Sequence, residues 1–171
     1  MENLRNLVLL GFMGTGKSAV GRRVAALAGR PFREMDAELE RRAGKPIARI
    51  FAEDGEAAFR DLESALAAEW GRKDGAVISC GGGAVLREQN LRALGAHGVL
   101  VCLTARPDVI LERTARSKKR PLLDVADPGA KIRELLAARA PHYARVPHQL
   151  DTSDADVDEL AERLLDLWAR G

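Results

Sequence analysis

The chain has 171 residues, of which 46% are hydrophobic and 30% charged, and its formal net charge is +2. This size and composition are typical of one soluble globular domain with a substantial core. A charge so close to neutral does not indicate nucleic-acid binding, so we expect no nucleic-acid partner. The first apolar run is too short to span a bilayer and follows no basic leader, so we expect a cytoplasmic protein with no membrane partner.

Apolar runs alternate with amphipathic segments along the whole chain. Five runs have the composition of buried strands, at residues 6–12, 31–35, 76–80, 98–104 and, more weakly, 148–152. Segments with the apolar spacing of helices cover residues 18–29, 36–44, 46–55, 55–71, 106–116, 130–146 and 155–170. Uniformly apolar strands separated by helices are typical of a parallel sheet covered on both faces. The sequence therefore predicts an α/β fold with a five-stranded parallel sheet, formed by residues 1–171 as a single domain.

Local signals refine the first two helices. Val20, Val24 and Leu27 share one face of the helix predicted over 18–29, and Gly29 is suited to end it. Asp36 is suited to cap the start of the next helix.

Two cysteines and two tryptophans have structural interpretations. Cys80 and Cys102 each lie in an apolar run without a partner at metal-ligand spacing, so we expect them to be reduced and buried on strands. Trp70 and Trp168 lie late in amphipathic helices, where we expect them to pack against the core.

The stretch "GFMGTGKS", residues 11–18, fits the pattern G-x-x-x-x-G-K-[ST] between a predicted strand and a predicted helix. Its glycines let successive N–H groups turn toward phosphate oxygens, and the helix N-terminus adds its positive end. Lys17 supplies a mobile charge for the β- and γ-phosphates, and Ser18 offers a hydroxyl to Mg²⁺. The sequence therefore predicts a nucleotide site formed by Gly14, Thr15, Gly16, Lys17, Ser18 and Ala19.

Two further features follow predicted strands. Glu34 and Asp36 lie at i and i+2, so on an extended segment they would point to the same side. The alternative is that Asp36 only caps its helix and Glu34 is solvated. Three glycines at 81–83 cost backbone entropy, which indicates close approach of a ligand to their N–H groups.

Three arginines are candidates for binding anions. Arg60 lies on a predicted helix, Arg139 lies in "AARAPHY", and Arg120 lies in the cationic run "SKKRPLL". Arg60 could instead belong to a solvated helix face, and the cationic run could be an exposed charge patch. The irregular segment at about 116–128 suits a mobile lid that brings Arg120 over bound phosphates.

Taken together, these segments resemble the shikimate kinase family, of the nucleoside monophosphate kinase structural group. The resemblance covers nearly the whole chain and rests on "GFMGTGKS", the acidic pair before "AELE", "IFAEDGEAAFRDLE", "SCGGGAV", "RPLL" and "RAPHY". "FAEDGEAAFRDLE" and "RAPHY" distinguish it best from adenylate and gluconate kinases. The resemblance implies a three-layer P-loop kinase fold with a substrate-binding helical segment at about 36–64 and the mobile lid.

The resemblance also implies ATP- and Mg²⁺-dependent phosphorylation of the 3-hydroxyl of shikimate, a step toward chorismate and the aromatic amino acids. Asp36 would bind the ring hydroxyls and face the reacting one. Arg60 and Arg139 would bind the carboxylate, and Gly82 would offer a backbone contact. Lys17, Asp36 and Arg120 would be the catalytic residues. Arg113 and the segment that contains Asp154 would border the adenine.

One residue departs from the family pattern, which usually has Asp where Glu34 stands. That carboxylate is expected to hold Mg²⁺ mainly through water, together with Ser18 as the other metal-binding residue. A longer side chain can reach the same water shell, so we expect activity to be retained without a direct Glu34–Mg²⁺ bond.

Two other functions remain open at this point. One is a kinase for another small hydroxy acid such as gluconate, and the other is a ligand sensor of this fold with little turnover. Nothing in the sequence indicates a subunit interface, so we expect a monomer.

Overall fold

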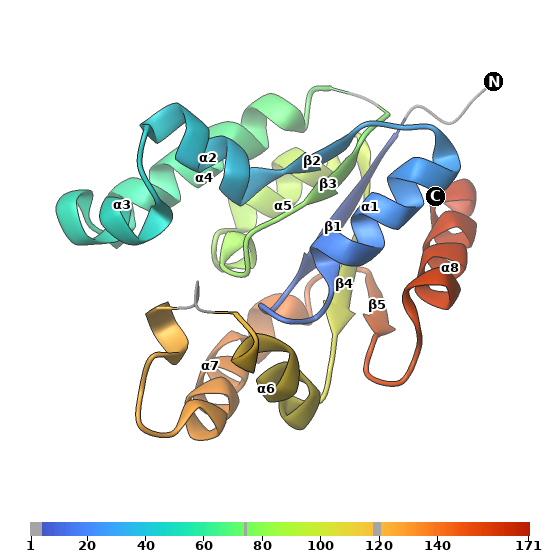
Figure 1. The fold of residues 1–171 in the computed structure, drawn as a ribbon. Helices are drawn as coiled ribbons and strands as arrows, with labels where there is room; N and C mark the ends of the chain where they lie inside the picture. Colours follow the sequence, from blue (N-terminus) through green and yellow to red (C-terminus); the bar gives the residue numbers. More distant parts are fainter. Residues whose placement is uncertain (1–4, 74, 118–120) are drawn as a thin grey trace.

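The computed structural model of the protein describes residues 5–73, 75–117 and 121–171. In this part of the chain five parallel strands form one sheet in the order β2-β3-β1-β4-β5 (Figure 1). The strands are β1 (Asn6–Gly11), β2 (Phe32–Glu34), β3 (Val77–Ser79), β4 (Gly98–Thr104) and β5 (His148–Asp151). The predicted five-stranded parallel sheet is therefore confirmed.

Helices connect the strands and cover the sheet. They are α1 (Lys17–Ala28), α2 (Met35–Ala43), α3 (Ile47–Asp54), α4 (Glu56–Trp70), α5 (Glu88–Gly95), α6 (Pro107–Ala115), α7 (Pro128–Tyr143) and α8 (Val157–Arg170), with short 3₁₀ helices η1 (Ala84–Leu86) and η2 (Pro121–Leu123). Within the described ranges, none of these helices combines the length and the apolarity needed to cross a membrane.

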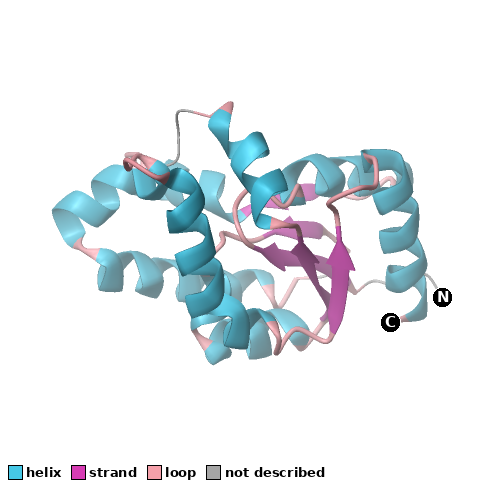
Figure 2. Cartoon of the chain, turned by 90° about the horizontal axis from the view of Figure 1, so that it is seen from below, coloured by secondary structure: helices cyan, strands magenta, loops and turns pink. Residues whose placement is uncertain are grey.

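The central strand β1 contributes side chains to the hydrophobic core on both faces of the sheet. Val8 and Leu10 pack into a cluster that includes residues of α4, α5 and α7, whereas Leu7 and Leu9 pack into a second cluster with residues of α1 and α8. Because successive side chains of a strand point to opposite faces, one apolar strand supplies both clusters. Figure 2 shows the strands between helices on both sides, which is the expected three-layer arrangement.

Two local expectations for the first helices need correction. Leu27 is 47% exposed, so the buried face of α1 is formed by Val20, Gly21, Val24 and Ala25 without it. The cap expected at Asp36 is also wrong. The helix begins at Met35, and no side chain caps it. Asp36 lies instead in the first turn, where a carboxylate favours the helix dipole.

The earlier start of α2 changes the relation between the two acidic residues. Because the chain becomes helical at Met35, Glu34 and Asp36 do not lie on one extended segment as expected. Glu34 ends β2, and Asp36 extends from the first helical turn.

The strand register determines which loops lie side by side. Glu34 of β2 and Leu9 of β1 both pair with Ser79 of β3, so β2 and β3 end at the same level and β1 continues two residues further, to Gly11. The turn after β1, the glycines after β3 and the start of α2 therefore meet at one edge of the sheet. Ligands of open parallel sheets bind at this edge, outside the carboxyl ends of the strands.

A substitution in β1 tests the two-layer core. Leu9→Ala removes a fully buried side chain and should lower the free energy of unfolding by about 2–5 kcal/mol. The control Leu27→Ala removes a leucine of similar size from the surface and should change it by no more than about 0.5 kcal/mol. Urea titrations followed by circular dichroism measure both, and equal losses in the two variants would contradict this core assignment.

Candidate active site

The turn after β1 has the backbone shape of a phosphate-binding loop. Gly16 precedes α1 with a φ of 95°, a left-handed conformation that glycine adopts without strain. In the part of the chain that the structure describes, no side chain caps the helix that follows. The first N–H groups of α1 can therefore serve an anion, as the sequence pattern predicts.

Lys17 extends its side chain back across this loop. Its Nζ donates hydrogen bonds to the carbonyl oxygens of Gly11 and Phe12, at 2.7 and 2.9 Å. These contacts place the ammonium group beside the N–H groups at the start of α1. A cation and a row of N–H donors in this arrangement fit the triphosphate of a nucleotide.

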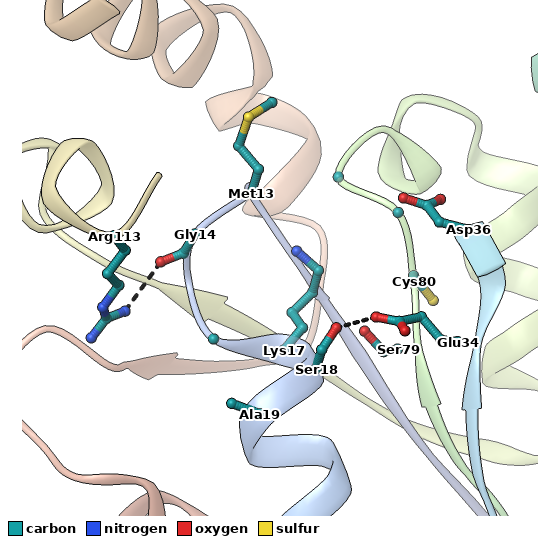
Figure 3. A pocket seen from close by; sticks show the side chains of 13 residues that line it. Met13, Gly14, Lys17, Ser18, Ala19, Glu34, Asp36, Ser79, Cys80 and Arg113 are labelled. Atoms are coloured by element: carbon teal, nitrogen blue, oxygen red, sulfur yellow. Dashed lines mark hydrogen bonds between the residues drawn. The ribbon is translucent and has the colours of Figure 1, made fainter. Parts of the chain in front are cut away.

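A cavity of about 240 Å³ opens beside the loop (Figure 3). It is lined by Met13, Gly14, Gly16, Lys17, Ser18, Ala19, Glu34, Asp36, Ser79, Cys80, Gly81, Gly82 and Arg113. Nine of these residues are predicted site residues: Gly14, Gly16, Lys17, Ser18, Ala19, Glu34, Asp36, Gly82 and Arg113. The structure thus brings residues from four separate segments of the chain, around residues 13–19, 34–36, 79–82 and 113, to one cavity.

Glu34 is held in place by side chains from the N-terminal part of α1. The Ser18 hydroxyl donates a hydrogen bond to Glu34, and Arg22 forms an ion pair with the other carboxylate oxygen at 3.2 Å (Figure 3). The Arg22 guanidinium also lies over the Phe32 ring, 4.7 Å from its centroid. These contacts contradict the interpretation of Glu34 as a merely solvated side chain.

The donor set near Ser18 and Glu34 fits a magnesium ion that keeps most of its own shell. Among the described residues, no group of three His, Cys, Asp or Glu side chains could hold a metal ion. One hydroxyl and one carboxylate suffice where phosphate oxygens and waters supply the other ligands, as Mg²⁺ usually requires.

The three glycines after β3 leave space for side chains of the site. A Cβ built on Gly83 would lie 2.3 Å from Nη1 of Arg60, and one built on Gly81 would lie 2.6 Å from Oδ1 of Asp36. Glycine is therefore needed at both positions, because a side chain there would overlap Arg60 or Asp36. For Gly82, where the nearest atom would be Nη1 of Arg139 at 3.4 Å, backbone contact with a ligand stays a prediction.

Arg60 is buried, which contradicts its alternative interpretation as part of a solvated helix face. Its side chain forms an ion pair with Glu63 at 3.0 Å and lies over the Phe59 ring, 5.2 Å from its centroid. Glu63 is only 1% exposed. Burial raises the pKa of Glu63, while the positive charge of Arg60 acts against that rise.

Sequence reasoning did not assign a role to Glu63. The signal was present in "FRDLE", because residues at i and i+3 are neighbours on a helix surface. The burial of both charges was not readable from that spacing.

Arg139 reaches the same glycines from α7. It is 9% exposed, and its guanidinium lies over the Phe12 ring, 5.8 Å from its centroid. One turn further along α7, the Tyr143 hydroxyl donates a hydrogen bond of 2.7 Å to the carbonyl of Gly82. Burial raises the pKa of Tyr143 to about 12, so it remains a donor at neutral pH. Two arginines far apart in sequence thus approach adjacent glycines.

Arg113 lies at the other end of the cavity. It donates hydrogen bonds to the carbonyl of Gly14 at 3.2 Å and to the carbonyl of Thr152 at 2.7 Å. Arg113 is thereby attached both to the phosphate-binding loop and to the segment after β5, and its contact with the nucleotide stays a prediction.

Among the described residues, two of the predicted nucleotide contacts, Thr15 and Asp154, do not line the cavity. Asp154 is exposed and forms an ion pair with Arg106 at 2.8 Å. Thr15 is buried, and its hydroxyl donates to the carbonyl of Phe12, so this side chain supports the loop from inside. Arg120 lies outside the described residues, as do residues 118 and 119 of the predicted lid.

Cys80 lines the cavity, but its environment does not favour a nucleophile. Both cysteines are free and buried, as predicted, but only Cys102 lies on a strand, since β3 ends at Ser79 and Cys80 follows it. Burial raises the pKa of the Cys80 thiol well above its ordinary value and that of Cys102 to about 11. The reactive thiolate is therefore scarce at neutral pH.

The fold and the site together define a P-loop kinase, with a phosphate-binding loop and a glycine turn that two buried arginines, Arg60 and Arg139, approach. Comparison with known proteins gives the family. The family model for shikimate kinase matches residues 13–169. The shikimate kinase of Pelotomaculum thermopropionicum is 44% identical over 162 residues, which cover 95% of this chain and 94% of that relative. The shikimate kinase of Desulforudis audaxviator is 50% identical over 149 residues, covering 87% and 78%.

A solved structure agrees with these sequence matches. The shikimate kinase from Acinetobacter baumannii in complex with shikimate superimposes with a TM-score of 0.92 at 38% identity, covering 99% of this chain and 95% of that one. The chain belongs to the shikimate kinase family.

The cysteine environments give a direct test. Because both thiols are buried and have raised pKa values, the native protein should react slowly with a chromogenic aromatic disulfide at mildly alkaline pH. After denaturation, both thiols should react at the rate of a free thiol. Absorbance of the released thiolate measures the number and the rate, and one fast thiol in the native protein would contradict this description of the cavity wall.

Proposed function

We propose that the chain transfers the γ-phosphate of ATP to the 3-hydroxyl of shikimate in the cavity beside the phosphate-binding loop. Membership of the family makes it a kinase that uses ATP and Mg²⁺. The observation that supports this site most strongly is the approach of Arg60 and Arg139 to adjacent glycines beside Asp36. Shikimate is a small carboxylate with several hydroxyls, and two cations next to one carboxylate match those groups chemically.

Arg60 and Arg139 bind the substrate carboxylate in this proposal. A planar guanidinium can donate two parallel hydrogen bonds to a carboxylate, which an ammonium group does less well. Both guanidinium groups are largely buried, so their attraction to an anion is weakened less by solvent than that of exposed cations. Gly82 contributes a contact from its backbone.

Asp36 orients the acceptor. It lies at the cavity wall next to Gly81, where its carboxylate can accept hydrogen bonds from ring hydroxyls. An aspartate is a poor base in water, with an ordinary pKa of about 3.9. Phosphoryl transfer through a loose transition state needs little early deprotonation, so Asp36 acts mainly by holding the 3-hydroxyl in line.

In this proposal the phosphate-binding loop and the residues next to it bind the phosphates of ATP. Bound ATP with Mg²⁺ supplies the phosphoryl group that is transferred. Lys17 and, from the lid, Arg120 stabilise negative charge on that group. Ser18 holds the ion directly and Glu34 through water. The remaining nucleotide contacts are assigned to Gly14, Thr15, Gly16, Ala19, Arg113 and Asp154.

The same proposal divides the chain by role within one domain, residues 1–171. The segment at about 36–64 binds shikimate, and the lid at about 116–128 closes over the phosphates. Closure excludes water, which otherwise competes as acceptor. We further propose that the protein acts as a cytoplasmic monomer without a nucleic-acid or membrane partner. Its two buried free thiols are compatible with a reducing compartment.

A coupled assay of ADP formation tests the function. Shikimate should stimulate ADP release strongly, whereas gluconate and nucleoside monophosphates should not. Comparable release without any acceptor would indicate an ATPase, and shikimate binding without ADP release would indicate a sensor. The family match and the two relatives favour a shikimate kinase over a gluconate kinase or a ligand sensor with little turnover.

The packing of Gly83 predicts an effect on shikimate alone. In Gly83→Ala the new methyl group overlaps the Arg60 guanidinium and displaces it, so the KM for shikimate should rise about tenfold while the KM for ATP stays unchanged. Arg60→Gln should raise the shikimate KM by about 10- to 150-fold. The control Gly129→Ala adds a methyl group that meets no atom closer than 3.5 Å and should leave both constants unchanged. A rise in both constants for Gly83→Ala would contradict the assignment.

The role of Asp36 predicts a defect in turnover. Asp36→Asn keeps the size of the side chain but changes its charge and hydrogen bonding, so kcat should fall on the order of 100-fold or more. Circular dichroism should show an unchanged fold, and binding of ADP should be retained. Turnover near that of the unmodified protein would refute the role given to this carboxylate.

A further inference from the structure

Thr152 connects three parts of the nucleotide end of the site. It follows β5 directly and is 0% exposed. Its hydroxyl donates to the carbonyl of Thr15 at 2.8 Å, and its N–H donates to the carbonyl of Thr104 at the end of β4, also at 2.8 Å. The residue thus joins the phosphate-binding loop to the ends of two neighbouring strands.

The same threonine holds Arg113. Its hydroxyl accepts a hydrogen bond from Nη1 of Arg113 at 3.0 Å, and its carbonyl accepts one from Nη2 at 2.7 Å. Within the described ranges, the only other acceptor of a hydrogen bond from this guanidinium is the carbonyl of Gly14 (Figure 3). Two of the three bonds that orient Arg113 therefore end on Thr152.

The partners of Arg113 leave its charge available to a ligand. Across residues 5–73, 75–117 and 121–171, no carboxylate forms an ion pair with it, whereas the nearby Arg106 pairs with Asp108 and Asp154. Arg113 is oriented by neutral oxygens and lines the cavity. A guanidinium held in this way keeps its attraction for an anion or for the face of an aromatic base.

A hydroxyl is the group that these contacts require. It can donate one hydrogen bond and accept another at the same time, here toward Thr15 and from Arg113. An isosteric methyl group would leave a buried carbonyl and a guanidinium N–H without these partners, which is costly.

We propose that Thr152 is a positioning residue for nucleotide binding, which holds Arg113 over the nucleotide end of the cavity and ties it to the phosphate-binding loop. This inference rests on the proposed function only in taking that end of the cavity as the site of a nucleoside di- or triphosphate. Thr152 acts through Arg113 and touches no reacting atom.

The test compares Thr152→Val with Thr152→Ser. The valine variant should bind ADP about tenfold more weakly by calorimetry and show a similar rise in the KM for ATP, with the KM for shikimate unchanged. The serine variant retains the hydroxyl and should bind ADP within about twofold of the unmodified protein. If Thr152→Val does not fold, Thr152→Ala against Thr152→Ser gives the same comparison.

Thr114→Val is the matched control. Thr114 is also a buried threonine and adjoins Arg113 in sequence, but its hydroxyl donates to the carbonyl of Ile110 in its own helix. This variant should leave ADP binding unchanged. A structural role alone would lower the melting temperature of Thr152→Val without a selective loss of nucleotide binding.

A double-mutant cycle tests the path through Arg113. If Thr152 acts by orienting that side chain, Thr152→Val should weaken ADP binding much less in an Arg113→Met background than in the unmodified protein. Additive effects, equal rises in both KM values, or failure of serine to restore binding would overturn the proposal. Calorimetry with ADP needs no acceptor, so the proposal for Thr152 can hold even if shikimate does not stimulate ADP release. Conversely, if shikimate stimulates ADP release but Thr152→Val binds ADP normally, the proposed function holds and the role of Thr152 does not.

Discussion

The ion pair between Arg60 and Glu63 is the interaction on which the proposed substrate side of the site depends. Both side chains are largely removed from water, and a buried charge without a partner is strongly destabilising. Glu63 provides that partner one helical turn away, and aromatic rings of Phe51 and Phe59 flank the guanidinium. Arg60 is therefore held in place before any substrate arrives, which reduces the entropy lost on binding.

The glycine turn after β3 is shaped by the same requirement. Arg60 occupies the space that a side chain at position 83 would need, and Asp36 occupies the space at position 81. Tyr143 fixes the backbone between them through the carbonyl of Gly82. Asp36 of α2, Arg60 of α4 and Arg139 of α7, which are proposed to bind the substrate, thus converge on one short turn because that turn carries no side chains of its own.

Glu34 shows how the site accommodates a departure from the usual family residue. Its carboxylate accepts a hydrogen bond from the Ser18 hydroxyl and pairs on the other side with Arg22, whose guanidinium lies over the Phe32 ring. The contact couples the two residues assigned to Mg²⁺. That the longer side chain serves the water shell of Mg²⁺ stays a prediction.

The sequence by itself determined the parallel α/β fold, the phosphate-binding loop, the family and most of the residues that line the cavity. These features could be predicted because strand and helix periodicities are local and because "GFMGTGKS" encodes its own backbone turn. Only the tertiary structure shows that Arg60 is buried with Glu63 and that Gly81 and Gly83 leave space for neighbouring side chains. It also shows that Arg113 is attached to Thr152, and that Asp154 pairs with Arg106 and does not line the cavity. Each of these depends on side chains from different elements meeting at one edge of the sheet, and spacing along the chain does not specify such distances. The sequence did not predict the helix start at Met35 for a related reason. Aspartate is a residue type that commonly caps helices, but here the Asp36 carboxylate lies at the cavity wall.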